Sequence, residues 1–158
     1  MKIAIFTDSY LPTVDGVVTS VLTTRRQLEA DGHEVIVFAP EDPKRRVQDD
    51  THTILVRAHE LRHYPGYRLA IYPGREVDQV KELGVDIIHI HGVGTVGIKG
   101  LWASWQARIP SVQTFPTMIQ DTLPFYSPFG INLHVLERGL RLYLRIFLRK
   151  STGVVVPS

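Results

Sequence analysis

The first forty residues place two short, continuous apolar runs on either side of an amphipathic segment. The runs Lys2 to Thr7 and Glu34 to Ala39 have the length and composition of strands buried on both faces. The segment Val17 to Ala30 has apolar residues at helical spacing, with Asp15 at its start and Gly32 after its end. Such a strand, helix and strand make a right-handed crossover between parallel strands. The chain is therefore predicted to build a parallel sheet covered by helices.

The same alternation continues along the rest of the chain. Further strands are predicted at Thr53–Arg57, Asp86–Ile90, Ser111–Phe115 and Gly153–Val156, and further helices at Arg75–Leu83, Thr95–Ala107 and Leu133–Lys150. This pattern indicates one α/β domain, residues 1–158, with a Rossmann-like, doubly wound parallel sheet. Charged residues and Pro-Gly turn signals predict irregular structure at Pro40–Thr51 and His59–Pro73.

The bulk composition excludes several functional classes. The 158 residues include no cysteine, so disulfides, thiolate catalysis and cysteine-bound metals are excluded. A formal net charge of +2 gives no indication of a nucleic-acid partner. The apolar run near Met1 is shorter than the hydrophobic part of a signal peptide, and no later run is long enough to span a bilayer. We expect a cytoplasmic protein with no cofactor.

The loop Asp8 to Gly16 is the first candidate site, because open parallel sheets bind ligands at the carboxyl ends of their strands. It is long and ends at a helix start, where free backbone N–H groups favour an anion or a sugar hydroxyl. Gly16 either starts the helix cleanly or lets a ligand approach the backbone closely. The loop lacks the G-x-G-x-x-G pattern of a dinucleotide site.

A second candidate follows the strand Asp86 to Ile90. His89 and His91 lie on the same side of an extended chain, but no further ligand follows at metal-binding spacing, so we expect no metal. His91 is a candidate for lining a crevice at the strand end, whereas a structural role is favoured for His89. In the following helix, Gly97 and Gly100 are predicted to allow close packing on the sheet.

The third candidate is the loop from Gln113 to Asp121. Its hydroxyl, amide and carboxylate groups suit a carbohydrate or a polar headgroup. These groups belong to Thr114, Thr117, Gln120 and Asp121. The alternative is that Thr117 or Asp121 caps a short helical turn.

The helix Leu133 to Lys150 carries a row of arginines at spacings of three and four residues. The row consists of Arg138, Arg141, Arg145 and Arg149. Val135, Leu142 and Ile146 lie beside it, as on an interfacial helix that binds an anionic membrane. The alternative is a helix covered by further protein, with its arginines solvated or paired with acids. The sequence favours this alternative, because basic helix edges are common in soluble proteins.

Taken in order, these segments resemble the N-terminal domain of retaining glycosyltransferases of the GT-B fold, in the large family 4. The segment Phe6 to Ser20 looks like the family's opening, with the pattern Thr-Asp-x-Tyr-x-Pro-x-x-x-Gly-Val. The segment Leu28 to Val35, followed by Pro40, is similar to the second-strand signature, and Asp86 to His91 matches the family's Asp-hydrophobic-hydrophobic-His-x-His strand end. The match spans essentially the whole chain, and its motifs are closest to those of diacylglycerol glucosyltransferases.

The resemblance implies a two-domain enzyme that moves a sugar from a UDP- or GDP-linked nucleotide sugar to an acceptor with retention. It implies that a lipid or carbohydrate acceptor binds this half, while the nucleotide sugar binds mainly a C-terminal donor domain that is absent from this chain. We therefore expect an acceptor-side domain that is not competent alone. On this reading Gly16, His91, Thr117 and Asp121 contact the acceptor or the donor phosphate.

The chain departs from the family pattern at Pro116. The family carries Thr-Tyr-His-Thr-Met where this chain has Thr114 to Met118. In the resembling enzymes the imidazole lies by the transferred sugar and helps to position it. Its loss is worth roughly 10²-fold or more in rate, so no catalytic residue is assigned.

The alternative function is a non-catalytic binding module or degenerate half-enzyme that docks to a partner chain or to an anionic membrane. Docking of this kind would make the protein peripheral on the inner face of the membrane. The membrane-facing candidates are the four arginines of the helix Leu133 to Lys150.

Overall fold

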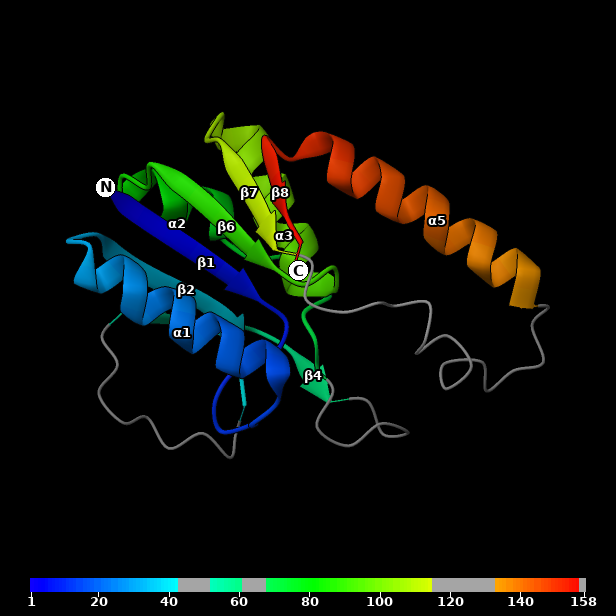
Figure 1. Cartoon of the computed structure of the whole chain (residues 1–158), viewed down its shortest axis with the longest axis horizontal. Coiled ribbons are helices and arrows are strands. Elements are labelled where there is room, and N and C mark those ends of the chain that lie inside the picture. The colour runs from blue at the N-terminus through cyan, green and yellow to red at the C-terminus, as the bar shows by residue number, and fades with distance from the viewer. Residues whose placement is uncertain (43–51, 61–67, 115–132, 157–158) are drawn as a thin grey trace.

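The computed structural model describes residues 1–42, 52–60, 68–114 and 133–156 (Figure 1). Its main sheet consists of β1 (Lys2–Thr7), β2 (Glu34–Pro40), β3 (Thr53–Val56), β6 (Ile87–His91), β7 (Ser111–Thr114) and β8 (Gly153–Val155). The strands are parallel and lie in the order β3-β2-β1-β6-β7-β8. Because the winding direction reverses between β1 and β6, the predicted Rossmann-like, doubly wound sheet is confirmed.

Helices cover both faces of this sheet (Figure 1). They are α1 (Gly16–Ala30), α2 (Glu76–Glu82), α3 (Thr95–Ala107) and α5 (Leu133–Lys150). Helix α1 lies on one face and α2 and α3 on the other. The Tyr143 hydroxyl of α5 donates a hydrogen bond to the Val93 carbonyl, which ties this helix to the loop after β6. The predicted elements are confirmed to within two residues over the described ranges.

One prediction is wrong in the segment between β3 and α2. Irregular structure was expected from His59 to Pro73, but β4 (His59–Glu60) pairs antiparallel with β5 (Arg68–Leu69). The pairing is supported by Arg68, which forms ion pairs with Asp42 at 3.1 Å and with Glu60 at 3.3 Å. Each of these strands has only two residues, which is too short for an alternating pattern to predict it.

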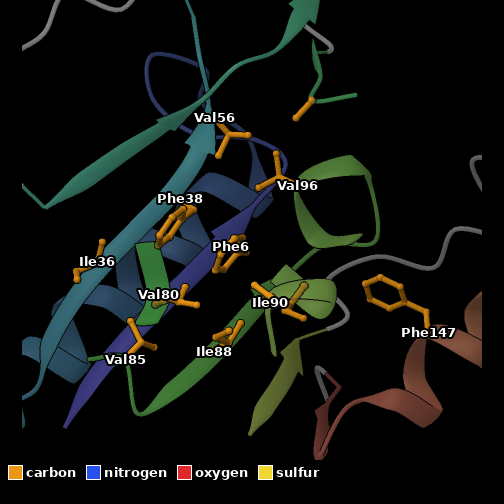
Figure 2. Close-up of a cluster of buried hydrophobic side chains, with 13 residues drawn as sticks. Phe6, Ile36, Phe38, Val56, Val80, Val85, Ile88, Ile90, Val96 and Phe147 are labelled. Atoms are coloured by element: carbon orange, nitrogen blue, oxygen red, sulfur yellow. The ribbon is translucent and has the colours of Figure 1, made fainter. Parts of the chain in front are cut away.

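The larger part of the core lies between the sheet and helices α2 and α3 (Figure 2). At its centre the rings of Phe6 and Phe38 stack with centroids 4.3 Å apart. A Cβ on Gly100 would lie 2.7 Å from Cγ of Phe6, so this glycine allows α3 to approach the sheet, as predicted. Ile88 and Ile90 of β6 belong to the same core.

Alternation along β6 turns its two histidines to the opposite face, on the side of α1. His89 is paired in register with Ile5, which belongs to the core beneath α1, and His91 is paired with Thr7. Side chains at paired positions of neighbouring strands point to the same face of a sheet. One face of β6 is therefore hydrophobic, and the other brings two imidazoles towards the carboxyl end of the sheet.

Candidate ligand site at the carboxyl ends of the strands

His91 lies in a row of polar side chains across three adjacent strands. It is in register with Thr7 on β1 and with Thr114 on β7, at the carboxyl end of each strand. The His91 side chain is fully buried, and neither of its ring nitrogens has a hydrogen-bond partner among the described residues. By contrast, the hydroxyl of Thr7 donates to the carbonyl of Ser9 at 2.8 Å. His91 is thus a buried polar group that the described part of the chain leaves unsatisfied.

His89 has the structural role that the sequence favours. Its Nε2 lies 2.8 Å from the hydroxyl oxygen of Thr114, which links β6 to β7. The two imidazole rings are packed against each other, with centroids 4.2 Å apart. No group of three metal-ligating side chains occurs among the described residues, so these two rings gain no third ligand there.

The surroundings of both rings keep them neutral. Burial lowers the pKa of His91 to about 3, and repulsion from His89 adds to this effect. Burial also lowers the pKa of His89 to about 4. A neutral imidazole has one N–H donor and one nitrogen acceptor, which matches the donor and acceptor of a hydroxyl group. The site is therefore suited to a neutral, hydroxylated ligand rather than to an anion.

Asp8 is a key residue of this edge to which the sequence analysis assigned no role. Its carboxylate follows β1 and accepts backbone hydrogen bonds from Gly94 at 2.8 Å and Val96 at 2.7 Å, at the start of α3. Burial raises the pKa of the Asp8 carboxyl, while backbone hydrogen bonds from Val96, Gly94 and Gly97 act in the opposite direction. The N-terminus of α3 is thus occupied by an anion from within the chain.

Glycines make the room for this carboxylate. A Cβ on Gly92 would lie 2.8 Å from Oδ2 of Asp8, and one on Gly94 would lie 2.7 Å from its Oδ1. A Cβ on Gly97 would lie 2.7 Å from the Gly92 carbonyl oxygen. In the sequence, three glycines within six positions indicate that another part of the chain packs closely against the start of α3.

Gly16 lies at the start of the other helix that leaves this edge. Asp15 caps α1 by accepting a hydrogen bond from the Val18 N–H at 2.8 Å, and it also accepts one from the Ser9 hydroxyl at 2.7 Å. One of the free N–H groups expected here is therefore used by the chain itself. Gly16 is exposed, and a Cβ built on it would meet nothing within 4 Å. Packing within the chain does not require glycine at this position.

The remaining sequence predictions divide between described and undescribed residues. Pro116, Thr117 and Asp121 lie outside the described residues, so the third loop stays a prediction. The row of arginines on α5 is exposed at all four positions, Arg138, Arg141, Arg145 and Arg149. Leu142 and Ile146 beside it are 57% and 54% exposed. No helix in the described ranges combines the length and apolarity needed to cross a membrane.

The sheet topology identifies the fold class of the chain. A doubly wound parallel sheet with helices on both faces is an α/β domain of the Rossmann-like kind. Residues 14–158 match Glycosyltransferase Family 4. The chain belongs to this family, and the fold is of the glycosyltransferase type.

The chain is also similar in sequence to three glycosyltransferases. The chain is 37% identical over 129 residues to an alpha-monoglucosyldiacylglycerol synthase of Acholeplasma laidlawii, covering 80% of this chain and 32% of the relative. A Streptococcus pneumoniae protein of the same name is 29% identical over the whole chain and 35% of its own length. A GDP-mannose-dependent alpha-mannosyltransferase of Mycolicibacterium smegmatis is 31% identical over the whole chain and 42% of its own length. The chain thus spans 32% to 42% of the length of these relatives.

Proposed function

We propose that this chain is the acceptor-side domain of a retaining, GT-B glycosyltransferase that uses a UDP- or GDP-linked sugar. Its acceptor is a lipid or a sugar, and a lipid is favoured by the relatives named as glucosyldiacylglycerol synthases. The share of those relatives that the chain spans supports a requirement for a second, donor-binding domain. The chain alone is therefore expected to transfer no sugar, and turnover by the isolated chain would overturn this proposal.

The observation that carries the acceptor role is the unsatisfied imidazole of His91. A buried polar group without a partner costs roughly 1–3 kcal/mol. A ligand hydroxyl at the carboxyl end of β6 would recover part of that free energy by pairing with one of the two ring nitrogens. Because His91 has no exposed surface, the acceptor reaches the ring only when neighbouring residues move aside.

A buried water could satisfy the same nitrogens, so the acceptor role needs a direct test. Dioctanoylglycerol in detergent micelles is titrated into the chain while the imidazole signals are followed by nitrogen-15 NMR. Binding should shift the His91 signals and should be lost in His91→Ala. His59→Ala is the matched control, because His59 is an exposed histidine on β4. Unchanged His91 signals at saturating dioctanoylglycerol would contradict the proposal.

The other expected contacts of this site are proposed from the family pattern. Gly16 gives close access to the backbone at the start of α1, and Thr117 and Asp121 line the acceptor crevice. Pro116 leaves the complete enzyme without the family histidine. Restoring histidine at this position in a protein with a donor domain should raise the rate of transfer by roughly 10²-fold.

Docking to an anionic membrane is a second candidate function, which would place the protein at the inner face of the cytoplasmic membrane. It is supported by the exposed arginines of α5 together with the exposed Leu142 and Ile146. Within the described part of the chain, no acid forms a salt bridge with Arg145 or Arg149. Basic side chains next to apolar ones favour binding to an anionic membrane. Each cation near the membrane surface contributes about 1 kcal/mol to the binding free energy.

Co-sedimentation with vesicles containing phosphatidylglycerol tests this docking. The double variant Arg145→Glu and Arg149→Glu should lose binding, and added salt should weaken binding of the wild type. The matched control reverses two exposed cations elsewhere, Arg26→Glu on α1 and Lys81→Glu on α2, with the same change in net charge. Equal losses in both double variants would mean that net charge, and not the surface of α5, governs binding.

A further inference from the structure

A pocket of about 330 Å³ lies between α2 and α3 on the face of the sheet opposite His91. Its walls are mostly apolar, and two charged side chains form its polar part. The residues that define it are Pro73, Glu76, Val77, Ile98, Lys99 and Trp102. Trp102 is 52% exposed and Ile98 is 45% exposed, so the pocket mouth presents an indole ring and an aliphatic side chain to solvent.

Glu76 and Lys99 form an ion pair in the pocket, and each keeps unused hydrogen-bonding capacity. Lys99 Nζ donates to Glu76 Oε1 and to the Tyr72 carbonyl, both at 2.9 Å. An ammonium group has three N–H donors, so one remains. In the described part of the chain, Oε2 of Glu76 accepts no hydrogen bond. Both side chains are largely buried, with 15% of Lys99 and 10% of Glu76 exposed. The pocket therefore offers one fixed donor and one fixed acceptor.

The aromatic wall is also held in place. The rings of Trp102 and Trp105 meet edge to face, with centroids 5.2 Å apart. This contact restricts the rotation of the Trp102 indole, whose free surface borders the pocket. Exposed aromatic side chains beside a concave surface commonly mark binding sites.

We propose that this pocket binds a single pyranose ring. A sugar has C–H groups that pack on an indole face and hydroxyls that can pair with Glu76 and Lys99. An acyl chain would cover those two groups without replacing the hydrogen bonds they make to water, which is costly. A free anion would meet the Glu76 carboxylate, and a cation would meet Lys99. The volume lies near the lower end of the range for ligand pockets, about 300–1,000 Å³, which suits one ring.

The site extends the proposed function without depending on it. It is separated from His91 by the sheet, so a sugar bound between α2 and α3 leaves the acceptor edge free. A domain that holds one sugar here could retain a glycosylated product or a glycan-bearing surface. We expect weak, millimolar affinity, because the pocket is open and small.

The two tryptophans of the chain make a direct test possible. Methyl α-glucopyranoside and methyl α-mannopyranoside are titrated into the chain, and the two indole N–H signals are followed by NMR. The Trp102 signal should shift to saturation. Trp102→Ala should weaken binding by at least about tenfold, as loss of a 1.4 kcal/mol contact does. Leu55→Ala, which truncates an exposed apolar side chain on β3 outside the pocket lining, should bind normally.

Three results would overturn the proposal. The first is an unshifted Trp102 signal at saturating glycoside, and the second is normal binding by Trp102→Ala. The third is equal binding of cyclohexanol, a ring with a single hydroxyl, which would mean that Glu76 and Lys99 take no part. The Trp105 signal reports folding of the Trp102→Ala variant. His91→Ala should leave glycoside binding unchanged, so failure here and failure of the acceptor site are distinguishable.

Discussion

Helices α1 and α3 both begin at the carboxyl edge of the sheet, after the neighbouring strands β1 and β6, yet their N-termini differ. The start of α3 is filled by the Asp8 carboxylate, which accepts the N–H groups of Gly94 and Val96. The start of α1 is capped by Asp15 from its own preceding loop, and the space beside Gly16 is open. Both helix starts bind an aspartate carboxylate of the chain, but only the start of α1 has open space beside its glycine.

The glycines at the two helix starts therefore serve different purposes. Gly92, Gly94 and Gly97 make room for contacts within the chain, whereas none of the described residues restricts Gly16. The proposed ligand contact at Gly16 is therefore compatible with packing at the start of α1. The difference between the two helix starts also shows that a glycine near a helix start identifies a ligand site only when packing within the chain does not explain it.

Removing the Asp8 carboxylate should have the largest effect on stability. Asp8→Ala leaves two backbone N–H groups of α3 without their acceptor, and the free energy of unfolding should fall by about 3 kcal/mol. Asp15→Ala, the matched change at α1, should cost about 1 kcal/mol, because it frees one N–H at an exposed cap. Urea unfolding of both variants measures the difference. Equal losses would break the distinction between the two helix starts.

Adding a methyl group at Gly97 tests the close packing at α3. The new Cβ would lie 2.7 Å from the carbonyl oxygen of Gly92, a backbone atom that cannot rotate away. Gly97→Ala should therefore lower the free energy of unfolding by about 1–3 kcal/mol, despite the better helix propensity of alanine. Thermal unfolding followed by circular dichroism measures it. A variant as stable as the wild type would show that the loop after β6 yields more easily than its contacts suggest.

The buried histidines of β6 should make the free energy of unfolding depend on pH. Their folded pKa values of about 3 and 4 lie below the ordinary value of 6.5, so the unfolded chain binds protons that the folded chain does not. Stability should therefore fall as pH falls through 6.5, by roughly 2 kcal/mol for each histidine between about pH 7 and pH 5. The loss should continue towards the folded values.

A variant isolates the contribution of His91. Asp8, whose pKa is raised by burial, contributes with the opposite sign, so wild type and His91→Gln are compared under identical conditions. Urea unfolding at several pH values should show a shallower pH dependence for His91→Gln. Identical slopes would mean that His91 accepts a proton in the folded state near its ordinary pKa.

The sequence was sufficient for the sheet and insufficient for the contacts that close its edge. Strands such as Lys2–Thr7 are continuous apolar runs, and α1 has recognisable start and stop residues, so local patterns predicted them. Asp8 and Gly94 are 86 positions apart, and their contact arises only after β1 and β6 pair. His91 was predicted as a site residue from its place at a strand end, but its burial and its missing partner depend on the whole fold.

The smallest expected effect on stability is also the most informative for function. Gly16→Ala meets nothing within 4 Å and should raise the free energy of unfolding by about 0.5–1 kcal/mol, because alanine favours a helix over glycine. If a ligand also contacts the backbone at Gly16, sugar transfer by the complete enzyme should fall several-fold in the same variant. Gly139→Ala on α5 is the matched control, since a Cβ there also meets nothing within 4 Å. It should stabilise the protein without loss of activity. Full activity in Gly16→Ala would mean that the open start of α1 is not a ligand site and would leave His91 as the main support for the acceptor role.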